Sequence, residues 1–128
     1  MLEKILSFTS LITFLMLISI YPMRKVKLKN IKFERTKNKV YCSLKKNHNL
    51  LSVIFLIVSL IHGIIAIKSG STSGAMSGKF AWMFILLMSI LIVFRNLNKE
   101  KWAIVHRIMS VIATVLIIIH IGVTLIWK

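Results

Sequence analysis

Acidic residues are nearly absent from this chain of 128 residues, which has three glutamates against 18 lysines and arginines. The resulting formal charge of +15 is typical either of nucleic-acid-binding proteins or of membrane proteins whose cations lie between spans. There is also only one cysteine, Cys42. A lone cysteine excludes an internal disulfide and leaves no spaced set of thiolates for a metal.

Long apolar runs are what the chain has in abundance, since 57 % of its residues are hydrophobic. Several of these runs are long enough to cross a membrane, and the cations lie between them. We therefore expect one compact transmembrane domain over residues 1–128, with membrane lipid as its surroundings. The same placement of the cations argues against nucleic acid as a partner, and no stretch is left for a separate soluble enzyme domain.

The expected fold is an all-α bundle of four transmembrane helices. Pro22 and a burst of cations are expected to end the first helix. This helix is predicted to be an anchor, because a cleavable signal peptide would have a stronger positive start and a small-x-small cleavage pattern. The composition of 70–78 predicts a flexible turn that cannot hold a helix. The predicted helices cover about 4–22, 44–69, 79–96 and 101–127.

Cations are distributed unequally between the two sides of this predicted bundle. Residues 24–46 hold ten lysines and arginines and residues 95–107 hold four, whereas the opposite side holds only Lys4, Lys68, Lys79 and Lys128. By the positive-inside rule, the two cation-rich segments face the cytoplasm. The prediction is a multi-pass protein of a prokaryotic plasma membrane with both termini extracytoplasmic. The second and fourth helices then run parallel.

All four histidines lie in these two parallel helices, as two pairs with the same spacing. His48 and His62 are fourteen residues apart in the second helix, and His106 and His120 are fourteen apart in the fourth. Fourteen residues are nearly four turns, so each pair leaves about the same face of its helix with roughly 21 Å between its members. Parallel helices bring His48 level with His106 and His62 level with His120.

Two imidazoles at one level, one from each helix, can hold a haem iron from both sides. The pattern therefore predicts two b-type haems between the second and fourth helices, with axial pairs His48/His106 and His62/His120. Both haems are expected to be non-covalent, because the chain has no C-x-x-C-H motif. With both axial positions filled, each iron is expected to carry electrons and not to bind oxygen.

Further residues share the histidine faces, because positions four and seven away from a ligand lie on its side of a helix. The large Phe55 is expected to meet the small Ala113 at the midpoint between the haems. Lys45 and Arg107 lie where propionates of the inner haem would emerge, although their role as positive-inside anchors is an equal alternative. The remaining residues on the two faces are Ser52, Ser59, Ser110 and Ile117.

Two other roles for the histidines are open. A single histidine at a helix end is commonly an interfacial or hydrogen-bonded side chain, but four with matched spacing and depth favour a functional set, since ionisable groups are costly in lipid. A path for copper, zinc or iron bound by histidine alone is the second alternative. Such sites usually recruit carboxylates or thiolates, and the only acids, Glu3, Glu34 and Glu100, lie outside the predicted spans.

Two segments resemble the haem-bearing helices of the ferric reductase and NADPH oxidase superfamily and of small bacterial b-type cytochromes. They are Leu44-Lys45-Lys46-Asn47-His48-Asn49-Leu50-Leu51 through His62-Gly63, and Lys101-Trp102-Ala103-Ile104-Val105-His106-Arg107 through His120. The resemblance covers about the last 85 residues. It implies four axial histidines and stacked haems that pass electrons across the membrane.

The chain departs from that superfamily in having four predicted spans where six are usual, and in lacking a dinucleotide fingerprint. The expected function is transmembrane electron transfer, without catalytic side chains, from a cytoplasmic donor protein or a quinol to an extracytoplasmic acceptor. The alternatives are a haem-bearing anchor subunit of a separate oxidoreductase, or a haem-free small scaffold or pore protein. A homodimer or a larger membrane oxidoreductase complex fits each of these.

The basic segment 23–43 is predicted to be a cytoplasmic loop. Its alternating Val26, Leu28, Ile31 and Phe33 favour a short strand pair or a segment lying on the interface. Contact with anionic lipid headgroups accounts for its lysines. An electrostatic dock for an acidic electron donor is the alternative.

Overall fold

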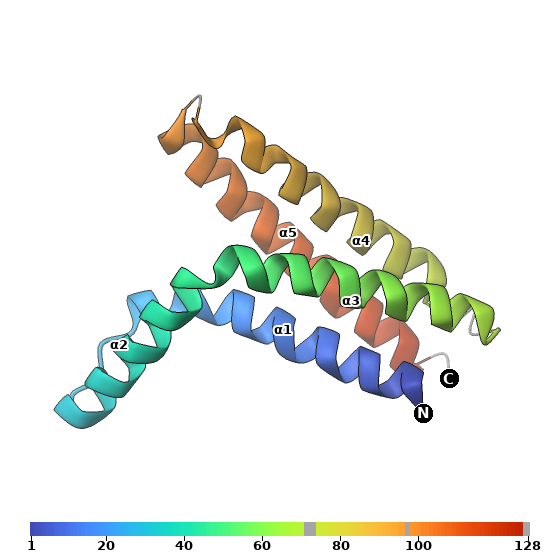
Figure 1. Cartoon of the computed structure of the whole chain (residues 1–128), viewed down its shortest axis with the longest axis horizontal. Coiled ribbons are helices and arrows are strands. Elements are labelled where there is room, and N and C mark those ends of the chain that lie inside the picture. Colours follow the sequence, from blue (N-terminus) through green and yellow to red (C-terminus); the bar gives the residue numbers. More distant parts are fainter. Residues whose placement is uncertain (71–73, 97, 127–128) are drawn as a thin grey trace. The chain divides into compact units, whose positions relative to one another are not determined.

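The computed structural model describes residues 1–70, 74–96 and 98–126, and every regular element in this part of the chain is a helix (Figure 1). The all-α prediction is therefore confirmed for the described residues. In chain order the elements are α1 (Leu2–Lys25), α2 (Ile31–Lys46), α3 (His48–Lys68), α4 (Ala75–Ile90), the 3-10 helix η1 (Leu91–Asn96) and α5 (Lys99–Ile126).

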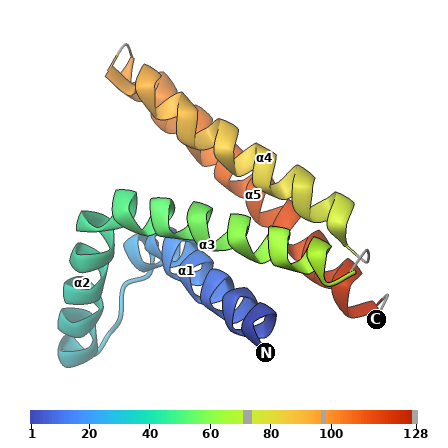
Figure 2. The same ribbon diagram turned by 45° about the vertical axis from the view of Figure 1, so that its right-hand side comes forward.

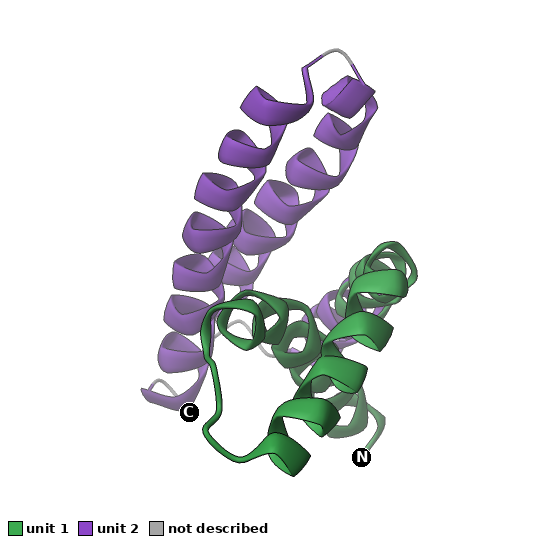
Figure 3. Ribbon diagram, turned by 90° about the vertical axis from the view of Figure 1, so that its left-hand side faces the viewer, with its two compact units in different colours: residues 1–59 green, residues 60–128 purple. Residues whose placement is uncertain are grey.

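Four of these segments are long and apolar enough to cross a membrane: α1, α3, α4 continued by η1, and α5. The predicted number of spans is thus confirmed by length and composition. The chain also divides into two compact units, which Figure 3 shows in different colours. We call Met1–Ser59 the N-terminal unit and Leu60–Lys128 the C-terminal unit, and the boundary lies within α3.

The first span ends later than predicted, because Pro22 lies inside α1 and the helix continues to Lys25. Proline cannot donate to the carbonyl of Ile18 and its ring crowds that carbonyl, but the carbonyl of Pro22 still accepts a hydrogen bond from Val26 N at 2.9 Å. Arg24 and Lys25 then lie in the last turn, where cations interact favourably with the helix dipole.

The prediction of a loop over 23–43 is wrong for most of its length, because residues 31–46 form the helix α2. Asn30 caps this helix, and its side-chain oxygen accepts a hydrogen bond from Lys32 N at 3.0 Å. Glu34 lies in the first turn, and Lys45 and Lys46 lie in the last, an order of charges that matches the helix dipole. No strand forms in residues 23–43, all of which the structure describes.

The second predicted helix, 44–69, is divided at Asn47, so that residues 44–46 belong to α2 and the span begins at His48. Asn47 has φ −94° and ψ 8°, outside the helical range, and its side-chain amide donates a hydrogen bond to Ser43 O at 3.1 Å. Asparagine side chains compete in this way with the helical backbone. Figure 2 shows α2 at a steep angle to α1 and to the beginning of α3.

The third span begins earlier than predicted, since α4 starts at Ala75 and includes Ser77 and Gly78. A turn over 70–78 is therefore wrong for residues 75–78, while 71–73 lie outside the described residues. Gly74 supplies the start of the helix with φ 77°, a left-handed conformation suited to glycine. The fourth span, α5, matches the prediction to within two residues at its start and reaches Ile126.

Few side chains are buried in either unit. Phe14, Thr13 and Phe55 are buried in the N-terminal unit, and Ala81, Ile85 and Ala113 in the C-terminal unit. Large apolar side chains such as Ile118 and Val111, each 61 % exposed, cover the outside of the spans. Such a surface would be unstable in water and suits a chain whose solvent is lipid.

Candidate functional site

Histidines that are fourteen residues apart in the sequence lie on the same α-helix. His48 and His62 lie on α3, and His106 and His120 lie on α5. The helical spacing on which the haem prediction depends is therefore present in the structure. All four side chains are neither fully buried nor fully exposed. A partly covered imidazole in a membrane span requires a polar partner or a ligand, because lipid supplies none.

His120 packs against the beginning of α4 at its two glycines. A Cβ added at Gly78 would lie 3.0 Å from His120 Cε1, and one added at Gly74 would lie 3.5 Å from the same atom and 2.4 Å from Thr124 Cγ2. These glycines thus allow α5 to approach α4 more closely than any larger residue would permit. The imidazole of His120 fills the space that their missing side chains leave.

Ser77 lies within hydrogen-bond distance of this imidazole. The Ser77 hydroxyl donates its single proton to Gly74 O at 2.9 Å, and its oxygen lies 3.1 Å from His120 Nδ1. The backbone of Gly74 is a second hydrogen-bond partner of the His120 side chain. Metal-ligating histidines usually have a hydrogen-bond partner of this kind behind the ring.

His62 differs from His120 in the surroundings of its Nδ1 atom. Its Nδ1 is buried and, within the part of the chain that the structure describes, has no hydrogen-bond partner. An unpartnered polar atom of this kind is costly inside a protein and more so in lipid, so it is a position where a ligand would be favourable. His62 and His120 both belong to the C-terminal unit, and the pair His62/His120 stays a prediction.

His106 stacks on the indole ring of Trp102, with ring centroids 4.7 Å apart and planes 14° from parallel. Trp102 is held in turn because its Nε1 donates a hydrogen bond to the backbone carbonyl of Leu91 at 3.1 Å. Met88, Val105 and Met109 complete a small cavity beside the imidazole. His48 belongs to the other unit, so the pair His48/His106 stays a prediction.

The other residues predicted at the haem faces have contacts of their own. Three serine hydroxyls donate to carbonyls of their own helices: Ser52 to His48 O at 2.7 Å, Ser59 to Leu56 O at 3.1 Å and Ser110 to Arg107 O at 2.8 Å. Phe55 is 5 % exposed and packs against Phe14 of α1, with ring centroids 5.8 Å apart. These contacts stabilise helices and neither require nor exclude a cofactor.

Lys45 lies in surroundings that the sequence did not indicate, whereas Arg107 and Ala113 lie on α5 as predicted. Lys45 belongs to α2, outside the span, where its ammonium lies 6.0 Å from the ring centre of Tyr41. Arg107 is exposed on α5 next to His106. Ala113 is almost fully buried, at 3 % exposed. Its expected position opposite Phe55 stays a prediction.

The contribution of α4 to the site was missed by the sequence analysis. Gly74, Ser77 and Gly78 surround His120, and Ala81 continues the same line of small residues toward the buried Ile85. The available signal was the G-x-x-x-G spacing of 74–78 directly before an apolar run, a pattern that brings membrane helices together. Its classification as a flexible turn concealed this signal.

A haem and a metal site built from protein alone need different numbers of protein ligands. Among the described residues no group of three or more His, Cys, Asp or Glu side chains gathers as a protein-only site would require. A haem needs only two imidazoles, because the porphyrin supplies the other four ligands of the iron.

Comparison of the chain with protein-family models, with curated proteins and with solved structures finds no match.

Proposed function

We propose that this chain is a small di-haem cytochrome b that carries electrons across a membrane. The single observation that supports the proposal most strongly is the setting of His120, whose Nδ1 lies 3.1 Å from the Ser77 hydroxyl oxygen and which stands fourteen residues from His106 on one helix. If His120 served only to join α4 to α5, a second span would not need histidines at the same spacing. α3 nevertheless carries His48 and His62, which are fourteen residues apart like His106 and His120 on α5.

In this proposal each side chain has a limited task. His62 and His120 hold one iron and His48 and His106 hold the other, each through one ring nitrogen. Ser77 keeps the imidazole of His120 in one orientation and one tautomer, as residues behind metal ligands usually do. Trp102 holds His106 by stacking, and the apolar surfaces of α3 and α5 exclude water from both levels. Bound haem supplies the one-electron iron chemistry.

Two axial histidines leave no open position on the iron, so we propose electron transfer and no bond chemistry at the chain's own side chains. The donor is a cytoplasmic protein or a quinol and the acceptor is extracytoplasmic, as in ferric-reductase-like proteins. Arg107 lies beside the level of His106 and is positioned to pair with haem propionates there. Lys45, on the basic helix α2, is a second cation for the same level.

Haem content of the purified chain tests this proposal directly. In detergent we expect two b-type haems per folded chain, released without covalent attachment, by the pyridine haemochrome assay together with far-ultraviolet circular dichroism. A variant with Ser19→Ala and Ser89→Ala is the matched control, because both hydroxyls donate to carbonyls of their own helices and neither lies on a histidine face. Less than one haem per chain in well-folded protein would exclude the proposal and favour a haem-free scaffold.

Direction of transfer depends on topology, which a fused reporter can determine. We expect a reporter at Asn38 to score cytoplasmic and one at Gly70 to score extracytoplasmic, because the cations gather on the side of α2. Gly70 is a suitable position, since no atom lies within 4 Å of a Cβ added there. Interchanged results would reverse the proposed direction of electron flow without affecting the haem sites.

A further inference from the structure

Four cations form one stripe along α2. Lys32, Arg35, Lys39 and Lys46 are separated by three, four and seven residues, so they project from the same side of the helix, and all four are exposed. The opposite side is partly buried and bears Glu34, Lys37, Tyr41 and Leu44. α2 is thus amphipathic. Its partly buried side faces the rest of the N-terminal unit, and the cationic stripe lies on the opposite side.

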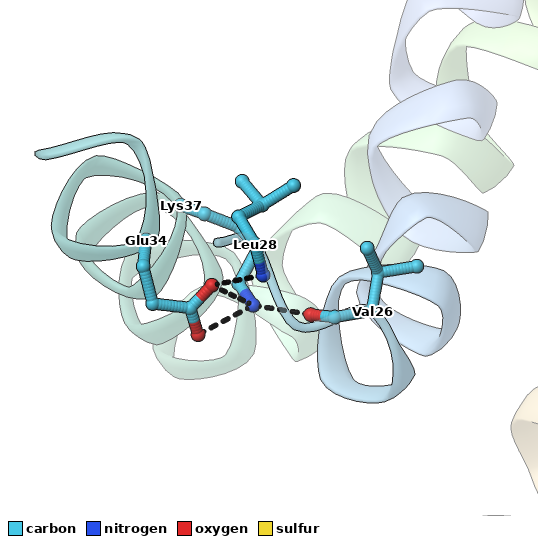
Figure 4. Close-up of polar contacts among 4 residues, drawn as sticks. All are labelled: Val26, Leu28, Glu34 and Lys37. Atoms are coloured by element: carbon cyan, nitrogen blue, oxygen red, sulfur yellow. Dashed lines mark hydrogen bonds and ion pairs between the residues drawn. The ribbon is translucent and has the colours of Figure 1, made fainter. Parts of the chain in front are cut away.

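The connecting segment 26–30 is fastened to α2 by a charged clamp (Figure 4). The Lys37 ammonium donates hydrogen bonds to Val26 O and to both carboxylate oxygens of Glu34, the latter at 2.8 and 2.9 Å. Glu34 Oε2 also accepts a hydrogen bond from Leu28 N at 2.9 Å. The clamp holds the side chain of Leu28 beside α2 and neutralises the one acid of the helix.

An open groove lies beside this clamp in the N-terminal unit. Its apolar lining comes from Leu28, Ile31 and Cys42, while Arg35 and Lys39 of the stripe add two cations. Glu34 and Asn38 complete the lining. Because Glu34 is already paired with Lys37, the groove presents an apolar surface next to two cations that have no acidic partner among the described residues.

The ends of α2 confine it to the membrane surface. Its beginning is joined to the end of the first span by the five residues 26–30, and its end is joined to the second span by Asn47 alone. Both spans therefore hold α2 at the same side of the bilayer. A steep angle between α2 and α1 (Figure 2) then lays the helix along that surface, where headgroups and acyl chains meet.

We propose that the groove binds one anionic phospholipid, whose phosphate lies between Arg35 and Lys39 and whose apolar part lies against Leu28 and Ile31. The charge of the chain supports this occupant, because 18 cations face only three acids and need counter-charges from outside the chain. An amphiphile with one negative charge matches both the cations and the apolar lining. The proposal does not depend on haem.

Binding of single lipids to the full chain in a neutral detergent tests the site. Phosphatidylglycerol and phosphatidylcholine are titrated separately, and bound lipids are counted by native mass spectrometry. We expect one phosphatidylglycerol per chain to bind before any phosphatidylcholine. The double variant Arg35→Gln/Lys39→Gln should weaken this first binding by at least about fivefold, the effect of one cation near an anionic headgroup.

The variant Lys27→Gln/Lys46→Gln is the matched control, because it removes the same charge from exposed residues that do not line the groove. It should change the first binding less than about twofold. Ile31→Ser, on the apolar lining, should weaken phosphatidylglycerol binding although the charge is unchanged. Circular dichroism checks that α2 is still helical in each variant.

Four outcomes would overturn the proposal. Equal binding of the two lipids would show no anionic site, and equal losses in the two double variants would show diffuse attraction by net charge. Preferential binding of a polyglutamate peptide over phosphatidylglycerol, abolished by Arg35→Gln/Lys39→Gln, would identify the stripe as a dock for an acidic protein. Displacement of the lipid by millimolar inorganic phosphate would likewise show that the apolar lining contributes nothing.

Discussion

The contacts inside the N-terminal unit differ in kind from the contacts inside the C-terminal unit. In the N-terminal unit the polar fastening is ionic, since Glu34 and Lys37 clamp the connecting segment to α2. In the C-terminal unit the fastening is neutral, since His120 packs on Gly74 and Gly78 and bonds to Ser77. The difference follows from position, because the clamp lies outside the predicted spans and the histidine contact lies between two of them.

Ions are stable where water can reach them, and small residues with neutral hydrogen bonds are stable where it cannot. Each unit should therefore respond to a different perturbation. Substitutions that enlarge or remove side chains between α4 and α5 should disturb the C-terminal unit. A change in pH should act on the clamp of the N-terminal unit.

The largest effect is expected from the histidines themselves. His62→Ala and His120→Ala should each remove the same haem, and His48→Ala and His106→Ala should each remove the other, leaving about one haem per chain. Combining two changes within a pair should add little, because both act on one site. A redox titration followed at the α band separates the two components. Loss of the same component in His48→Ala and His120→Ala would contradict the parallel arrangement of α3 and α5.

The next largest effect is expected at Gly74, where a side chain meets two obstacles. Gly74→Ala places a Cβ at φ 77° and 2.4 Å from Thr124 Cγ2, so we expect the C-terminal unit to lose about 2 kcal/mol of unfolding free energy. Unfolding by increasing mole fraction of dodecyl sulfate, followed by circular dichroism, measures the loss.

Two further glycines serve as controls for this change. Gly63 and Gly122 are helical and have no atom within 4 Å of an added Cβ, so alanine there should be neutral or stabilise by up to about 1 kcal/mol. Combining Gly74→Ala with Thr124→Ser removes the methyl group that the added Cβ would strike, and should restore part of the loss. Equal effects at all three glycines would show that close packing of α4 on α5 is not the cause.

A smaller effect is expected when the partner of His120 is removed. Ser77→Ala removes the hydroxyl that lies 3.1 Å from His120 Nδ1, so we expect about tenfold weaker haem binding at the His62/His120 site. Titration of the haem-free protein with haemin measures the change. Ser77→Thr, which keeps a hydroxyl, should restore binding, and Ser89→Ala is the matched loss of a hydroxyl elsewhere on α4. Unchanged binding in Ser77→Ala would assign Ser77 to helix packing alone.

The spans and the histidine spacing could be predicted from the sequence because both depend on regularities within one helix. Runs of apolar residues mark α1, α3 and α5 whatever their neighbours are. α2 was missed because the alternation of Val26, Leu28, Ile31 and Phe33 has the period of a strand. The Asn30 cap and the absence of Gly and Pro from 31–46 favour a helix instead.

The surroundings of His120 could not be predicted in the same way. Single-helix patterns indicate which residues share a face, but they do not say which neighbouring helix that face meets. The sequence analysis directed His120 toward the second span, whereas its ring also fills a space on α4 left by Gly74 and Gly78. Glycine has a low intrinsic helix propensity, which favoured a turn over these residues. Packing against α5 outweighs that propensity.

The smallest effect is expected at the clamp of the N-terminal unit. The Lys37 ammonium, which donates a hydrogen bond to Glu34, and the Leu28 amide together hold the pKa of that carboxyl below its ordinary value. A lowered pKa means that the clamp stabilises the fold above the ordinary glutamate pKa, and that this contribution is lost as the pH falls through the lowered one. The amide signal of Leu28, followed by nuclear magnetic resonance in detergent, should therefore move with a midpoint below the ordinary value. Glu34→Gln should abolish this midpoint and leave the signals of α4 and α5 unchanged, and a midpoint at or above the ordinary value would show that the clamp does not form in solution.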